Sequence, residues 1–152
     1  MMQMLEAGGM PVFVGPHGRT PNSGNARGSY EHDAPAGRDT AWLAHANGHA
    51  VKVVEDWLDS LPYDIDAKFI CMRRDLREVS ASRGYSLEAA TEHAAKLHAW
   101  LRAKDRLFVF HSRLVTDPGP EIERINAFLG SNLDTAAMAR VIDLSLWHHR
   151  AT

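Results

Sequence analysis

The sequence lacks the features of a secreted or membrane-embedded protein. Its 152 residues include one cysteine, Cys71, so the chain cannot form an internal disulfide framework. Cys71 lies in an apolar run, where cysteine usually behaves as a small buried side chain. No apolar stretch approaches the roughly 20 residues of a membrane-spanning helix, and no basic segment typical of a signal peptide opens the chain. We therefore predict a cytoplasmic protein without a membrane partner.

Excess positive charge and metal-binding motifs are missing as well. The formal net charge is -2, which argues against a nucleic-acid partner and requires a local basic cluster for any anionic ligand. Nine histidines are present, but no HExxH motif or Cys/His cluster occurs. His45 and His49 are four residues apart, yet Asn47-Gly48 between them is typical of a helix end. We predict no metal site.

Strand and helix signals alternate along the chain. Apolar runs predict strands at residues 11–14, 50–55, 68–72 and 107–110. Helical spacing, capping residues and glycine stops predict helices at residues 1–7, 39–47, 75–83, 86–101, 118–129 and 133–142. Residues 15–29, rich in Gly, Pro, Asn and Ser, are predicted to form a long loop. This alternation predicts one α/β domain over residues 1–152, with a parallel sheet covered by helices on both faces.

Several apolar positions are predicted to face the core. They recur at helical spacing in two of the helices, and four tryptophans are predicted to be buried or half-buried. The helical positions are Leu87, Ala90, Ala94, Leu97, Leu101, Ile122, Ile125 and Leu129.

Two arginines and a serine follow the strand predicted at residues 68–72. The strand delivers Arg73 and Arg74 to its carboxyl end, and Ser82 lies about two turns along the next helix. In parallel sheets ligands bind at this end, and a guanidinium with a serine hydroxyl suits a phosphate group. The alternative is that these arginines only form ion pairs with Asp75 or Glu78 at the helix start.

The segment from Arg74 to Ser82 resembles the sulfotransferase motif Arg-Asn-Pro-x-Asp-Val-x-x-Ser. Val79 matches the valine, Glu78 stands at the acidic position, and Asp75-Leu76 replace Asn-Pro. The run Leu107-Phe-Val-Phe-His-Ser-Arg-Leu-Val-Thr-Asp-Pro118 and the ending Phe128-Leu-Gly130 also resemble family segments, with His-Ser-Arg in place of Tyr-Glu-Asp. The resemblance implies a three-layer, P-loop NTPase-like fold. It also implies that Arg74 and Ser82 bind the 3'-phosphate of 3'-phosphoadenosine 5'-phosphosulfate (PAPS).

The resemblance further suggests catalytic residues. Residues 25–31, Asn-Ala-Arg-Gly-Ser-Tyr-Glu, are similar to a family segment near the acceptor site, which makes Glu31 and its neighbour His32 the candidate bases. Alternatively, Glu31 caps the loop or pairs with Arg27. Lys52, in an apolar run, resembles a family lysine that approaches the phosphosulfate, although a lysine at a sheet edge needs no such role.

The phosphate-binding loop of the family has no counterpart. Residues 1–9 resemble the helix that follows this loop. Relative to the family, the chain is therefore predicted to be truncated at its N-terminus and to lack the first strand and the loop. Such loops stabilise charge that develops during transfer. The stretch Gly15-Pro-His-Gly-Arg-Thr20 has no G-x4-G-K-[ST] pattern and is predicted to be an ordinary loop, which also disfavours a nucleotide kinase. Three explanations stay open: a partner chain that completes the sheet in an oligomer, a marginal fold, or an upstream start.

Two functions follow from the sequence. The first is transfer of a sulfonyl group from PAPS, without a metal, to a hydroxyl or amine of a small-molecule or carbohydrate acceptor. The second is a noncatalytic remnant or regulatory module that retains part of the nucleotide site.

Overall fold

The computed structural model describes residues 1–21, 27–32 and 40–147, except for the side chains of Asp56 and Leu146. The described residues form a mixed α/β structure with parallel strand pairs, which confirms the predicted class. They divide into two compact units. Unit 1 comprises Met1–Ile65 with Leu133–Val141, and unit 2 comprises Asp66–Asn132 with residues from Ile142 onward.

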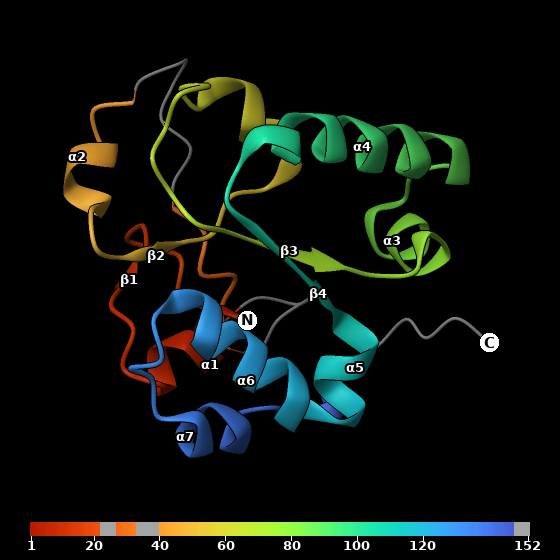
Figure 1. Ribbon diagram of the computed structural model, residues 1–152. Helices are drawn as coiled ribbons and strands as arrows, with labels where there is room; N and C mark the ends of the chain where they lie inside the picture. The colour runs from red at the N-terminus through yellow and green to blue at the C-terminus, as the bar shows by residue number, and fades with distance from the viewer. Residues whose placement is uncertain (22–26, 33–39, 148–152) are drawn as a thin grey trace. The chain divides into compact units, whose positions relative to one another are not determined.

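Among the described residues, unit 1 contains one short parallel strand pair, three short α-helices and a 3-10 helix (Figure 1). Val12 pairs with Ala50 and Phe13 with Val51. Its elements are α1 (Met2–Ala7), β1 (Val12–Phe13), α2 (Leu43–Ala46), β2 (Ala50–Val51), the 3-10 helix η1 (Glu55–Ser60) and α7 (Thr135–Arg140).

Helix α1 organises the core of unit 1, where it contacts β1, β2 and α7. Met4, Leu5 and Met138 of these helices are almost completely buried. Gly8, at the end of α1, lies so close to α7 that a Cβ atom there would be 2.7 Å from Cγ of Met138. The Gly8 carbonyl also accepts a hydrogen bond from the Asp134 N–H, at 3.0 Å. A side chain at position 8 would therefore separate α1 from α7.

Unit 2 contains a longer parallel pair, in which Phe69 to Arg73 match Arg106 to Phe110 in register. Figure 1 shows the two strands side by side. The elements are β3 (Phe69–Arg73), α3 (Leu76–Arg83), α4 (Leu87–Trp100), η2 (Leu101–Ala103), β4 (Arg106–Phe110), α5 (His111–Thr116), α6 (Pro118–Leu129) and η3 (Leu144–Leu146).

Side-chain caps begin two helices of unit 2, and the one at Ser86 was predicted. Asp75 accepts a hydrogen bond from the Arg77 N–H at the start of α3, and Ser86 accepts one from the Ala89 N–H at the start of α4. Helix α6 begins at Pro118 and buries Ile122 and Ile125 completely. The apolar spacing of α6 thus predicted its buried face correctly.

Several predicted details differ from the structure. Leu87 is 50% exposed rather than in the core, because it begins α4, where side chains point back past the helix start. Cys71 is half-buried, not fully buried. The predicted strand at 50–55 ends at Val51, and Glu55 begins the 3-10 helix η1 instead. Helix α2 is shorter than predicted, and its expected cap, Asp39, lies outside the described residues.

Candidate functional site

Glu31 and Lys52 meet at the carboxyl end of the strand pair in unit 1. Just beyond β1 and β2, Glu31 forms a parallel bridge with Lys52. Its carbonyl also accepts a hydrogen bond from the Gly15 N–H, at 3.2 Å. The carboxylate is 2.7 Å from the Lys52 ammonium. The structure therefore brings together two of the predicted catalytic residues, at the strand ends where parallel sheets bind ligands.

Lys52 is arranged as a partly accessible donor. Its side chain is 35% exposed, and its Nζ donates to the Ser29 carbonyl at 2.9 Å as well as to Glu31. An ammonium has three N–H groups, so these two bonds leave one N–H without an acceptor among the described residues. Exposure of the pair also avoids the cost of an uncompensated buried charge.

The backbone around Glu31 is tightly constrained. Tyr30 has a φ of 57°, a left-handed conformation that is uncommon outside glycine. Its N–H donates to the Gly18 carbonyl at 2.6 Å, and Gly18 lies so close to Glu31 that a Cβ atom would collide with the Glu31 carbonyl. Strained residues of this kind are often found at functional sites. Here the strained residue is Tyr30, which directly precedes Glu31 and is held by its hydrogen bond to Gly18.

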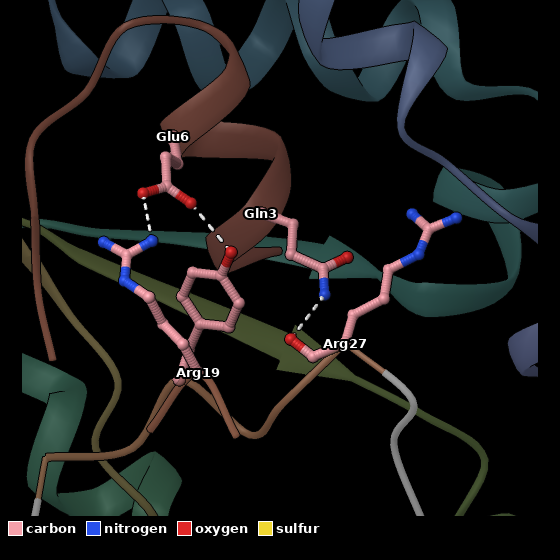
Figure 2. Close-up of polar contacts among 5 residues, drawn as sticks. Gln3, Glu6, Arg19 and Arg27 are labelled. Atoms are coloured by element: carbon pink, nitrogen blue, oxygen red, sulfur yellow. Dashed lines mark hydrogen bonds and ion pairs between the residues drawn. The ribbon is translucent and has the colours of Figure 1, made fainter. Parts of the chain in front are cut away.

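Side chains of helix α1 form hydrogen bonds with Arg19, Arg27 and Tyr30 (Figure 2). The carboxylate of Glu6 accepts hydrogen bonds from the Arg19 guanidinium and, at 2.7 Å, from the Tyr30 hydroxyl. Burial opposes ionisation of Glu6, but these bonds outweigh it and lower the pKa of the carboxyl. Gln3 donates to the carbonyl of Arg27, whose guanidinium donates to the Val141 carbonyl. The ion pair that Glu31 makes is with Lys52 rather than the alternative partner, Arg27.

His32 is directed away from the Glu31–Lys52 pair. Its ring packs against both Phe13, with centroids 4.8 Å apart, and Trp42, with centroids 5.2 Å apart, and these two rings are 6.2 Å from each other. Successive side chains of an extended segment point to opposite faces, which explains the separation from Glu31. Phe13 is also 6.2 Å from the ring of His49. This contact pattern suits His32 to packing better than to proton transfer.

Arg74 and Ser82 lie in unit 2, at the end of β3 and on α3. The guanidinium of Arg74 is 3.3 Å from the carboxylate of Glu78, so the ion pair proposed as an alternative is present. Glu78 and Ser82 are four residues apart on α3 and share one face of the helix. Arg74 thus contacts the helix face that also carries Ser82, and Ser82 is exposed.

Beside the Arg74–Glu78 pair lie two side chains, Trp147 and His111, that the sequence had not assigned to the phosphate site. Glu78 is only 5% exposed, and its carboxylate accepts a hydrogen bond from Nε1 of Trp147 at 3.2 Å. The Trp147 ring contacts His111 edge to face, with centroids 5.5 Å apart. His111 directly follows Phe110, the register partner of Arg73, so parallel pairing places it beside Arg74. The sequence signal that marked His111 was its place in the His-Ser-Arg run, where the family has Tyr-Glu-Asp.

His111 is held in its neutral form. Burial lowers the pKa of its ring, and the nearby Arg74 cation lowers it further, while Glu78 acts in the opposite direction. Its Nδ1 atom is buried and has no hydrogen-bond partner among the described residues. The ring therefore adds no second positive charge beside Arg74 near neutral pH.

In the described part of the chain, residues 1–21, 27–32 and 40–147, no three His, Cys, Asp or Glu side chains form a group that could bind a metal ion. No helix within it has both the length and the apolar character needed to cross a membrane.

Comparison with known proteins returned no significant match to a protein-family model, a curated protein or a solved structure. The resemblance to sulfotransferases therefore remains a hypothesis that depends on the motifs quoted above.

Proposed function

We propose that this chain is a sulfotransferase-type protein that binds PAPS and transfers its sulfonyl group to a hydroxyl or amine. The main support is the place of Arg74 at the carboxyl end of a parallel strand pair. Its guanidinium contacts the buried Glu78, which lies four residues before Ser82 on the same face of α3. A planar guanidinium and a hydroxyl provide directed donors to one phosphate group, here the 3'-phosphate of PAPS.

In the proposed reaction, the acceptor oxygen or nitrogen forms a bond to sulfur as the bond between sulfur and the bridging phosphate oxygen breaks. Glu31 accepts the acceptor's proton, and the remaining N–H of Lys52 donates to the leaving phosphate. The product nucleotide is 3'-phosphoadenosine 5'-phosphate. The 2.7 Å contact between Glu31 and Lys52 supports a shared role for these residues.

The fold proposed with this function is the three-layer parallel sheet of P-loop NTPase-like proteins. It is supported by parallel pairing within each unit and by helices that follow β3 and β4. A crystal structure would test this assignment. Four strands in one parallel sheet would support it, and two separate sheets would contradict it.

A noncatalytic nucleotide-binding protein is the second candidate, and the loop after β1 favours it. The N–H groups of Gly15, Gly18 and Thr20 donate to the carbonyls of Glu31, Gly15 and His17. These N–H groups are thus used within the backbone, whereas a phosphate-cradling loop directs them at its ligand.

Calorimetry with 3'-phosphoadenosine 5'-phosphate tests the nucleotide site. We expect the wild type to bind and Arg74→Ala to bind about 10- to 100-fold more weakly, because a hydrogen-bonded charge is lost. Arg77→Ala is the matched control, since it removes an exposed arginine from the first turn of the same helix. Equal binding by the wild type and Arg74→Ala would show that this site assignment is wrong.

Transfer from labelled PAPS to a panel of phenols, alcohols and amines separates the two candidates. For an enzyme, Glu31→Gln should lower the transfer rate by about 100- to 10,000-fold without changing nucleotide affinity. Nucleotide binding without transfer to any acceptor would favour the noncatalytic protein. Transfer that survives Glu31→Gln would exclude Glu31 as the base.

A further inference from the structure

A second arginine cluster lies at the end of the strand pair in unit 2. Phe110 ends β4 with a ring that is 38% exposed. The guanidinium carbon of Arg73, its register partner, is 5.7 Å from the ring centroid, and that of Arg113 is 4.8 Å from it. We call Arg73, Phe110 and Arg113 the arginine–phenylalanine patch.

The two charges of this patch are not neutralised locally. Both side chains are exposed, and within the described ranges neither guanidinium forms an ion pair or hydrogen bond with a carboxylate. Each contact with the ring contributes favourably, but it cancels no charge. Two cations held over one ring repel each other, and physiological salt screens this repulsion only in part. An anion that contacts both guanidiniums would relieve this repulsion.

The composition of the patch defines the ligand. A guanidinium matches the oxygens of a phosphate, and two guanidiniums match its double negative charge near neutral pH. Phe110 lies under both guanidiniums, and its exposed part adds an apolar surface that an aromatic group can contact. Arg74 does not belong to this patch, because its guanidinium contacts Glu78.

We infer that the arginine–phenylalanine patch binds the dianionic phosphate monoester of an aromatic compound. The phosphate contacts Arg73 and Arg113, and the aromatic group lies against Phe110. This inference goes beyond the proposed function and does not depend on it, since the residues of the patch have no role in the proposed transfer.

A titration with phenyl phosphate, followed by the backbone amide signals of the ¹⁵N-labelled protein, tests the inference. We expect saturable shifts at Arg73, Phe110 and Arg113. Phenyl sulfate, with one charge, and inorganic phosphate, without a ring, should each bind more weakly than phenyl phosphate. Shifts confined to Arg74 and Ser82, the absence of shifts, or equal affinity for inorganic phosphate would each overturn the inference.

Substitutions locate the charge contribution. Arg73→Ala and Arg113→Ala should each weaken phenyl phosphate binding about fivefold, the effect of one exposed charge pair. Arg102→Ala is the matched control, because it removes an exposed arginine near the opposite end of β4 and should leave the affinity unchanged. Wild-type affinity in Arg113→Ala would also overturn the inference. Arg74→Ala should leave the shifts at the patch intact, which separates this result from the nucleotide test.

Discussion

The lowered pKa of the His111 ring makes the stability of the protein depend on pH. Because burial and Arg74 hold its folded-state pKa below the ordinary 6.5, the unfolded chain binds a proton more readily than the folded one. The resulting contribution to stability is present above pH 6.5 and is lost as the pH falls through the folded-state pKa.

We therefore predict that His111→Phe makes the protein less sensitive to mild acid. Phenylalanine keeps a ring against Trp147 but cannot bind a proton. Urea unfolding at pH 7.5 and pH 5 should show that the wild type loses more free energy of unfolding than the variant between these values. An identical loss in both proteins would mean that His111 is equally basic in the folded and unfolded states.

At the residue scale, motif spacing predicted part of the candidate site. Arg74 and Ser82 were recognised because they are close in sequence, and Glu31 and Lys52 because of their surroundings in sequence. Trp147 and His111 became neighbours of Arg74 only through folding, since Trp147 is distant in sequence and the position of His111 depends on strand register. The ring stacking of His32 was also not visible from its type and position.

At the scale of elements, the start of α3 positions the arginine side chain. Asp75 caps this helix by accepting the Arg77 N–H at 2.8 Å, and the capped first turn carries Glu78, the partner of Arg74. The cap thus affects both the stability of α3 and the orientation of the guanidinium.

Asp75→Ala should lower the free energy of unfolding by about 1 kcal/mol, the usual effect of removing an N-cap. Asp75→Asn should retain most of the stability, because its side-chain oxygen still accepts the hydrogen bond. Chemical denaturation of the three proteins checks this order. If Asp75→Asn loses as much stability as Asp75→Ala, the negative charge rather than the cap is responsible.

Elements with strong local signals were predicted well. Helix α4 has a serine cap and sustained helical spacing, and α6 starts at Pro118 and ends before Gly130. Helix α5 was missed, because its six residues directly follow β4 without a cap or a break that separates strand from helix. The two-residue strands β1 and β2 are defined by pairing with each other, which local sequence specifies poorly.

At the scale of the whole molecule, unit 1 is built from two separated segments of the chain. Residues Leu133–Val141 return to it after most of unit 2, and α7 supplies Met138, whose side chain is fully buried. Stability of α1 therefore depends on residues more than a hundred positions away.

We predict that Met138→Ala destabilises unit 1 by about 2–5 kcal/mol, because it leaves a cavity in the core. Hydrogen exchange should show faster exchange for the amides of α1, whereas those of β3 and β4 change less if the units open separately. Leu87→Ala, at an exposed position, is the control and should change neither set by much. Uniform acceleration throughout the chain would show that the two units unfold together.

The late arrival of α7 also determines the order in which the chain can fold during synthesis. The ribosome releases α1 early, but its partner helix is not translated until after residues 66–132. At about 5–20 residues per second, this interval lasts on the order of 10 seconds. During that time the apolar face of α1, with Met4 and Leu5, lacks its final partner and is open to chaperones in the nascent chain.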